Sequence, residues 1–459
     1  MRGEIKRDLT EGSIPKNLIW FCFPVFLSAL LQALYGSADA VIVGRFSSLG
    51  DITGVTQGSQ CMNIITQGIS GISTGACVLI GQYLGAKKQE DTDRTISTVF
   101  TLFVLTGVAL AVGLQFLNGA LASLMQISPE AVPAFKAYLR ICEAGIPFIF
   151  LYNCIAAVLQ ALGDSRHPLI FVGVSCSLNI VLDMILIAGL GMGAEGAAAA
   201  TIFAQLVSVL LSVVFLRRQR FSFDFRPASF RLHWDKANKI LKLGMPYAIQ
   251  RVLVYSSFTA ISGLANVYGL EAGSAAGIVA KINTFATIPF SAFNIGVATI
   301  CAQCCGKRDI RRATRTMLTG TLLCLISGGT LFALCQLFPH RVLSIFTTNE
   351  SLIEIGVPFL RGYSWEYIIM PFTWSIHGLF SGCGHTIIPS FDGIIASVVF
   401  RTPLALFFSQ TMGMGYGGIS FGASMAVFGA VVFAWPIFFS GIWKRKKLFD
   451  KHSGLIGEE

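Results

Sequence analysis

The chain has 459 residues, of which 54% are hydrophobic and only 13% are charged. A soluble protein carries about a quarter charged residues, so this composition excludes a soluble enzyme or binding protein and predicts a polytopic membrane protein. The net charge of +10 would suggest nucleic-acid binding in a soluble chain. In a membrane protein basic residues first indicate topology, and we expect no nucleic-acid partner.

Twelve hydrophobic runs, each long enough to span a bilayer, follow one another along the chain. They lie at residues 17–44, 53–83, 95–117, 132–161, 168–190, 196–216, 240–263, 273–304, 316–338, 352–381, 388–411 and 417–442. The predicted fold class is therefore an all-α membrane protein with twelve transmembrane helices. The polar first seventeen residues do not resemble a cleavable signal peptide. Pro24 and Pro246, in the first and seventh spans, are predicted to be structural kinks.

Lysine and arginine side chains predict the orientation of these spans. Of the 34 in the chain, 26 lie in the amino-terminal segment, after spans two, four, six and eight, or in the carboxyl-terminal tail. The opposite loops offer little beyond Arg45 and Arg341. We therefore expect a multi-pass protein of the plasma membrane with both termini in the cytoplasm.

The two halves of the chain repeat each other at an offset of 221 or 222 residues. The repeat pairs Pro24 with Pro246, Gln82 with Gln303, Gly163 with Gly384, Pro168 with Pro389, and Gly191–Gly193 with Gly413–Gly415. Six spans is an even number, so both halves have the same orientation, as in the parallel repeats of secondary transporters. We predict two six-helix lobes, at residues 1–220 and 221–459, connected by a basic cytoplasmic segment at about 217–235.

Three short motifs could indicate either a chemical site or close packing of the chain. Gly191–Gly196 matches the dinucleotide fingerprint GxGxxG, but no βαβ unit surrounds it, so we interpret these glycines as turn residues. Cys301 and Cys304 form a CxxC. Because no His pair or second CxxC lies nearby, we interpret these cysteines as packing residues and not as a zinc or redox site. The GISFG motif at 418–422 predicts a close helix contact. We expect no cofactor, and no metal beyond a coupling cation.

A candidate site emerges from polar residues inside the spans of the amino-terminal half. Asp39 lies about six residues, or ~9 Å, inside the far end of the first span. Asn179 and Asp183 are four residues apart on one face of span five, and Thr201 lies at a similar depth in span six. Such oxygen ligands suit a cation, and two neighbouring acids also suit proton exchange. The alternative is a polar cluster that only holds three helices together.

The carboxyl-terminal half repeats the scaffold without these acids. At an offset of 222, the counterparts of the four candidate residues are Ile261, Arg401, Ala405 and Ala423. This half instead places cations in its spans, Arg251, Lys281 and Arg401, together with one acid, Glu366. They form either buried ion pairs with Glu366 or an anion-facing wall of a substrate cleft.

Four segments together resemble the multidrug and toxic compound extrusion (MATE) family. They are LLQALYGSADAVIVGRF in span one, GQYLGAKK after span two, QALGDSRHP after span four and SLNIVLDMILI in span five. The resemblance extends from about Leu9 to Lys447. It implies two six-helix lobes forming a V around a central cleft, and an amino-lobe cation site that maps onto Asp39, Asn179, Asp183 and Thr201.

The sequence therefore predicts an antiporter, not an enzyme, that exports small amphipathic organic compounds by alternating access. Na⁺ or H⁺ would be the coupling ion, and the protein would act as a monomer in the lipid bilayer. A lipid-linked precursor flippase is the first alternative, because the carboxyl-terminal half is basic. A polytopic membrane enzyme is disfavoured because no His or Asp cluster lies at the membrane surface. The major facilitator plan lacks support because its signature is missing after span two.

Overall fold

The computed structural model describes residues 7–218 and 229–444, with backbone alone at residues 259 and 262. Within these ranges the chain forms helices joined by short turns, and it contains no β-strand. Parts of the basic termini and of the predicted connection at 217–235 lie outside the described residues. The predicted all-α fold class is confirmed.

Helices occupy all twelve predicted spans. In the described part of the chain, nine helices are long and apolar enough to cross a membrane, or ten if α5 and α6, which meet at 47°, form one broken span. Spans seven and ten are α9 (Trp234–Asn266) and α14 (Glu350–Gly382), each 33 residues long. Neither helix is among the nine, and both contain interior charges, Arg251 in α9 and Arg361 and Glu366 in α14.

The internal repeat extends to the conformation of the backbone. Left-handed residues recur at the offset found in the sequence, with similar φ angles: Lys87 (54°) and Arg308 (66°), Gly163 (86°) and Gly384 (84°), and Gly191 (67°) and Gly413 (68°). Each pair lies in a turn between helices, where glycine adopts a positive φ at little cost. The first glycines of the two GxGxxG matches, Gly191 and Gly413, are thus turn residues, as predicted, whereas the last glycines, Gly196 and Gly418, are buried inside the helices that follow.

The helices pack into two compact units, which are not the same as the two predicted halves. Within the described ranges, the first unit contains residues 7–8, 27–84, 88–218 and 229–242. The second contains residues 9–26, 85–87 and 243–444. Two helices are consequently divided: α1 (Ile14–Phe46) changes unit two residues after Pro24, and α9 changes unit four residues before Pro246. Both predicted kink prolines therefore lie close to these changes of unit.

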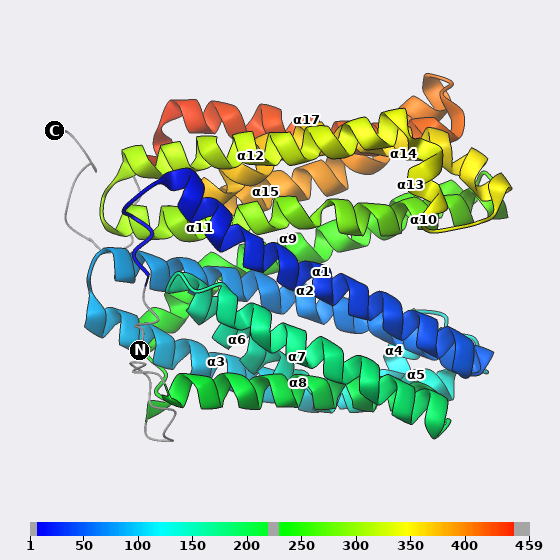
Figure 1. Cartoon of the computed structure of the whole chain (residues 1–459), viewed down its shortest axis with the longest axis horizontal. Helices are drawn as coiled ribbons and strands as arrows, with labels where there is room; N and C mark the ends of the chain where they lie inside the picture. Colours follow the sequence, from blue (N-terminus) through cyan, green and yellow to red (C-terminus); the bar gives the residue numbers. More distant parts are fainter. Residues whose placement is uncertain (1–6, 219–228, 445–459) are drawn as a thin grey trace. The chain divides into compact units, whose positions relative to one another are not determined.

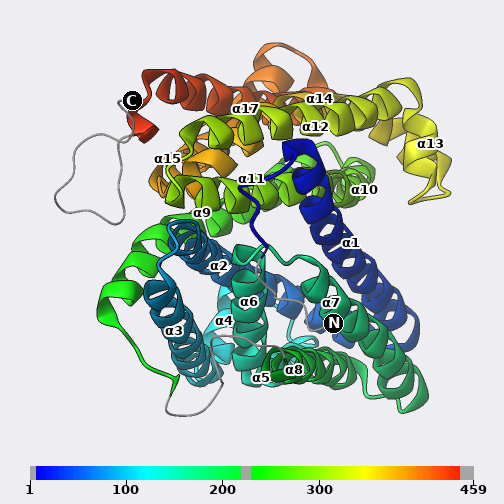
Figure 2. The same ribbon diagram turned by 60° about the vertical axis from the view of Figure 1, so that its left-hand side comes forward.

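Within the first unit, α3 packs against α6, and α8 packs against α5 and α7, an arrangement visible in Figure 2. Gly58 permits a close approach between helices, because a Cβ there would lie 2.5 Å from the Tyr138 ring. The helices of this unit are α2 (Leu49–Gly85), α3 (Gln89–Gln115), α4 (Asn118–Leu124), α5 (Val132–Ala144), α6 (Ile146–Ala161), α7 (Arg166–Asp183), the π-helix η1 (Met184–Gly189) and α8 (Gly193–Arg218).

The second unit is organised around α14, which packs against α10, α11, α12 and α17 (Figure 1). Gly422 in the GISFG motif of α17 confirms the predicted close contact, since its Cβ would lie 2.3 Å from the Leu404 carbonyl oxygen. The elements are α10 (Leu270–Ala286), α11 (Ile288–Gly306), α12 (Ile310–Leu337), α13 (Pro339–Ser344), α14, α15 (Ile387–Ile394), the π-helix η3 (Ile395–Arg401), α16 (Thr402–Leu406), the π-helix η4 (Phe407–Thr411), α17 (Gly415–Ser440) and the 3₁₀ helix η5 (Ile442–Lys444).

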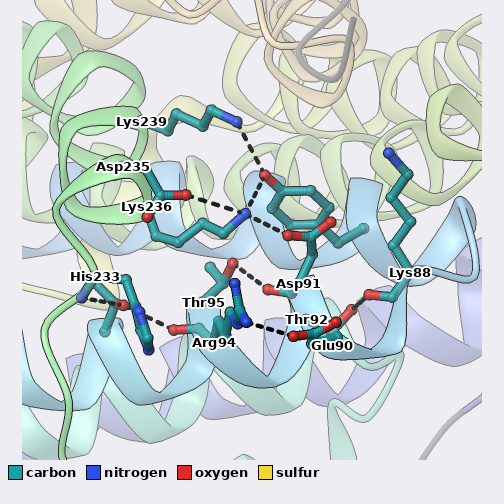
Figure 3. A network of polar contacts seen from close by, with 12 residues as sticks. Lys88, Glu90, Asp91, Thr92, Arg94, Thr95, His233, Asp235, Lys236 and Lys239 are labelled. Carbon is teal, nitrogen blue, oxygen red and sulfur yellow. Dashed lines mark hydrogen bonds and ion pairs between the residues drawn. The ribbon is translucent and has the colours of Figure 1, made fainter.

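A buried lysine attaches the first turn of α9 to α2 and α3, as Figure 3 shows. Lys236 Nζ lies 2.6 Å from Asp91 Oδ1, 3.0 Å from the Tyr83 hydroxyl and 4.5 Å from the centre of the Tyr83 ring. Lys239 Nζ also reaches the Tyr83 hydroxyl, at 3.2 Å. Although burial opposes the charge, hydrogen bonds to Asp91 and Tyr83 raise the pKa of Lys236. Its stabilising contribution is therefore complete at neutral pH and is lost only as the pH rises through this raised pKa.

We expect Asp91→Asn to lower the free energy of unfolding by about 2 kcal/mol, because it weakens a hydrogen bond between charged groups beside a buried ammonium. Thermal unfolding of the detergent-purified protein measures this loss. The matched control is Glu90→Gln, which removes the exposed Arg94–Glu90 pair and should cost about 0.5 kcal/mol or less. Equal losses in both variants would contradict a special role for the buried contact.

Candidate functional site

The two predicted acids lie in one cluster of the first unit. Asp39 projects from α1 and is half-buried, whereas Asp183 is the last residue of α7 and is fully buried, at 0% exposure. The two carboxyl groups are close enough to interact electrostatically. The π-helix η1 begins directly after Asp183, and such local changes of helix type occur frequently at functional sites.

Asn179 connects Asp183 to α8. In one orientation its amide nitrogen lies 3.4 Å from Thr201 Oγ1. Turned over, the same amide donates to Asp183 Oδ2 at 3.3 Å and accepts from the Thr201 backbone N–H at 3.3 Å. We prefer the second orientation because it satisfies a buried carboxylate oxygen. Asn179, Asp183 and Thr201 therefore meet, as the spacing along spans five and six predicts.

Each acid of the cluster retains one buried oxygen that lacks a hydrogen bond. Among the described residues, neither Asp39 Oδ1 nor Asp183 Oδ1 has a partner. A buried carboxylate without partners is unfavourable by several kcal/mol, and either a proton or a bound cation removes that penalty. With the amide and hydroxyl oxygens of Asn179 and Thr201, these acids are a chemically suitable donor set for a small hard cation.

Two tyrosines lie beside the acids and were not singled out as site residues from the sequence. Tyr35 precedes Asp39 by one helical turn and interacts electrostatically with both Asp39 and Asp183. Tyr152 of α6 interacts in turn with Tyr35, and its hydroxyl donates to the Pro168 carbonyl at 3.4 Å. The spacing of Tyr35 and Asp39 in the first span was the signal that could have identified Tyr35.

An acidic pocket lies at one end of the first unit. Its volume is about 370 Å³, and its lining includes Asp51, Glu130 and Glu195. Asp51 Oδ2 accepts from Ser48 Oγ at 2.7 Å, and Asp51 Oδ1 accepts from the Ala194 backbone N–H at 3.3 Å. Three carboxyl groups around one pocket raise the local concentration of cations.

In the second unit, Glu366 and Arg401 form a buried ion pair. The guanidinium Nη2 lies 3.3 Å from Glu366 Oε1, with side-chain exposures of 5% and 0% for arginine and glutamate. The Arg401 guanidinium also lies over the Phe258 ring, 4.2 Å from its centre. The sequence left two interpretations open for Arg401 and Glu366, and the structure shows the buried ion pair.

The other two predicted cations have different environments. Arg251 of α9 is half-buried and interacts electrostatically with Tyr247, one helical turn earlier. Lys281 is exposed on α10, and no ion pair among the described residues includes it. A role for either side chain in contacting substrate stays a prediction.

The sequence-based search also missed a buried histidine–aspartate pair in the second unit. His377 Nε2 of α14 lies 2.5 Å from Asp392 Oδ2 of α15. Asp392 is an acid inside the eleventh predicted span, and this placement alone was sufficient to identify it as a candidate.

Comparison with known proteins supports the family resemblance found in the motifs and the membrane-protein fold. A family model described as MatE matches the chain twice, at residues 24–185 and 246–407. The chain is 28% identical over 453 residues to the probable multidrug resistance protein YoeA of Bacillus subtilis, covering 97% of both chains. It is 24% identical over 456 residues to the probable multidrug resistance protein NorM of Thermotoga maritima, again covering 97% of both.

Solved structures show the same fold. A transporter of the MOP superfamily from Pyrococcus furiosus superimposes with a TM-score of 0.89 at 21% identity, covering 96% of this chain and 98% of that one. A MATE protein in complex with MaL6 also gives 0.89 at 21% identity, covering 95% and 98%. The two family matches are offset by 222 residues, which confirms the internal repeat. The chain therefore belongs to the MatE family, the multidrug and toxic compound extrusion transporters that its motifs predict.

Proposed function

We propose that this membrane transporter exports small amphipathic organic compounds in exchange for Na⁺ or H⁺, by alternating access. The observation that carries the proposal is the pair of buried carboxylate oxygens without hydrogen-bond partners, on Asp39 and Asp183. Two acids in one cluster are unfavourable when both are ionised and unneutralised. Exchange of a cation or proton relieves that repulsion reversibly, whereas a purely structural cluster needs only groups that satisfy one another.

Each side chain of the cluster has a separate role in the proposed coupling step. Asp39 and Asp183 supply the charge that a cation neutralises, Asn179 holds the Asp183 carboxylate in place, and Thr201 offers a hydroxyl oxygen. Binding shifts a conformational equilibrium only if the ion's affinity differs between the two states. Since Asp39 lies on α1 and Asp183 on α7, a relative movement of these helices would change the distance between the two charges and therefore the affinity for the ion.

The second unit supports the proposal by contrast. Arg401 occupies the repeat position of Asn179, and its guanidinium is a permanent cation held by Glu366. We infer that this unit has no exchangeable ion at the corresponding position. Because Glu366 already balances Arg401, the pair also gives little support to the flippase alternative, which needs free cations for an anionic lipid precursor.

The substrate class, the cellular location and the oligomeric state belong to the same proposal. Multidrug resistance proteins among the relatives favour drug-like organic compounds as substrates. The distribution of basic residues favours the plasma membrane with cytoplasmic termini. We further propose that the protein acts as a monomer, without a cofactor, catalytic chemistry or a nucleic-acid partner.

The proposed orientation can be tested with single cysteines in a cysteine-free background. A membrane-impermeant thiol reagent added to intact cells should label a cysteine placed by Ser48→Cys and miss one placed by Ser229→Cys, because the basic segments mark the cytoplasmic side. Labelling after permeabilisation serves as the control for accessibility. The reverse pattern in intact cells would invert the orientation.

The ion pair of the second unit should be structural and not part of ion exchange. Glu366→Gln leaves the buried Arg401 guanidinium without an opposing charge, so we expect a loss of about 3–5 kcal/mol. Glu366→Gln combined with Arg401→Gln should recover much of that stability. Stabilisation of the purified protein by Na⁺, or by acid, should survive in both variants, and its loss from the double variant would indicate a second ion site.

The sharpest test replaces the two acids of the first unit. Asp39→Asn and Asp183→Asn keep the side-chain shape but cannot release a proton and offer a cation no charge. Each variant should fold at least as stably as the wild type, because a buried charge is gone, and should lose ion-driven export. The measurement is efflux from proteoliposomes under an imposed Na⁺ or H⁺ gradient, together with a melting curve.

A structural cluster gives the opposite result in the same experiment. Removing a needed buried partner would lower the melting temperature, while the folded molecules would still transport. Ser37→Ala, on α1 beside the site, is a suitable control because its hydroxyl donates only to the Ala33 carbonyl of its own helix. Wild-type efflux from both aspartate variants would refute the proposed coupling site.

A further inference from the structure

The histidine–aspartate pair of the second unit has no place in the function proposed so far. His377 Nε2 and Asp392 Oδ2 are 2.5 Å apart, and the side chains are 12% and 1% exposed. Asp392 Oδ1 is buried and has no hydrogen-bond partner among the described residues. The pair therefore combines an unsatisfied carboxylate with an imidazole that remains partly accessible.

Both residues lie near the loop that connects α14 to α15. His377 is five residues before the end of α14, and Asp392 is five residues after the start of α15, so each lies about 8 Å inside its helix. The predicted orientation places this loop on the cytoplasmic side. A proton from that side would therefore cross a short distance to reach the imidazole.

Helix α9 covers the pair through two contacts. The Tyr247 hydroxyl lies 2.5 Å from Ser381 Oγ, which donates to the His377 carbonyl, also at 2.5 Å. Gln250 packs against α15 at Gly393, where a Cβ would lie 2.0 Å from the Gln250 amide nitrogen. A change in the charge of the pair would therefore alter its interactions with α9, one of the two helices that are divided between the units.

Other charged and titratable groups lie on the elements that pack around the pair. The electrostatic interaction found for Asp392 is with His377. Helices α11 and α17 contain no Asp, Glu, Lys, Arg or His, and α12 carries its arginines only in its first two turns. The other titratable or charged groups of these elements are Asp235, Lys236, Lys239, Lys242, Tyr247, Arg251 and Tyr255 of α9, Cys301, Cys304 and Cys305 of α11, Arg311, Arg312, Arg315, Cys324 and Cys335 of α12, Cys383 and His385 in the loop after α14, Arg401 of η3 and Tyr416 of α17.

Protonation determines whether the pair is electrically balanced. With a neutral imidazole, Asp392 is a buried negative charge, and burial of such a charge is costly. A proton on His377 gives an imidazolium beside the carboxylate, and the net charge of the pair becomes zero. Histidine is the side chain that ordinarily changes its charge between pH 5 and 8. Gly163–Gly384 and Pro168–Pro389 set the local repeat offset at 221 residues, so the corresponding positions in the first half hold Ala156 and Phe171, which indicates that the scaffold does not require the pair.

We propose that His377 and Asp392 form a proton-binding site in the second unit, distinct from the cation cluster of Asp39 and Asp183, and that its occupancy sets the pH dependence of export. A hydronium ion from the solution transfers one proton to the imidazole and becomes water, so that one O–H bond breaks as one N–H bond forms. The consequence for export rests on the proposed transport function. Proton binding itself does not depend on it.

The pH profile of export tests the regulatory part of the proposal. In proteoliposomes between pH 5 and 9, His377→Gln should remove one pH-dependent step, because glutamine can donate to Asp392 but cannot take up a proton. Asp392→Asn, which removes the negative charge beside the imidazole, should alter the same step. The matched control is His340→Gln, which removes an exposed pair with Glu354, 3.2 Å apart, and should leave the profile unchanged.

Nuclear magnetic resonance of the histidine-labelled protein tests proton binding without transport. The His377 signal is the one missing from His377→Gln among those of six histidines, and it should titrate between pH 5 and 9 in the wild type. A His377 signal that stays constant over this range overturns the site. Variants that melt at lower temperature but keep the wild-type pH profile also overturn the proposal, since the pair would then be a structural contact. Absence of export with a titrating His377 would refute the transport function alone.

Discussion

The fold depends on one constraint: an ionised side chain inside a membrane-spanning segment needs an opposite charge, an ion or a proton. Glu366 and Arg401 meet this need permanently, at 3.3 Å from each other. Asp39 and Asp183 do not, because no ion pair among the described residues includes either acid; each also retains a buried oxygen without a hydrogen-bond partner, as Glu366 Oε2 does. The same physical requirement therefore produces an ion pair in the second unit and, as we propose, a site for an exchangeable cation or proton in the first.

The repeat shows that the same helical scaffold contains an ion pair in one half and unpaired acids in the other. Turn glycines recur at the same offset with nearly equal φ angles, for instance Gly163 at 86° and Gly384 at 84°, so the helices begin and end at equivalent places. Asn179 and Arg401 then occupy equivalent positions on equivalent helices. An amide at this position orients a carboxylate and leaves room for a cation, whereas a guanidinium brings its own positive charge. Arg401 in place of Asn179 is one of four differences at the candidate site, together with Ile261, Ala405 and Ala423 in place of Asp39, Asp183 and Thr201.

Sequence reasoning predicted the features that depend on periodicity and composition. The twelve spans follow from hydrophobic runs, and the repeat follows from identical residues at a near-constant offset. Asn179 and Asp183 share a helix face because they are four residues apart, and Thr201 meets them from a similar depth in the next span. Partners across helices were harder to predict. The Lys236–Asp91 contact joins residues 145 positions apart, and nothing local links His377 to Asp392. The two compact units also differ from the predicted halves, since packing divides α1 and α9 near their prolines.

The fixed charge in the second unit restricts where coupling energy can arise. A guanidinium cannot leave, so the Arg401 position has the same charge in every step of a transport cycle. We therefore propose that free energy from an ion gradient enters through groups whose charge can change, namely the acids of the first unit and the His377–Asp392 pair. A ligand moves a two-state equilibrium only by its differential affinity, with about 1.4 kcal/mol for each tenfold difference. Repulsion between two carboxyl groups on separate helices depends on their distance, and this dependence is a direct source of such a difference.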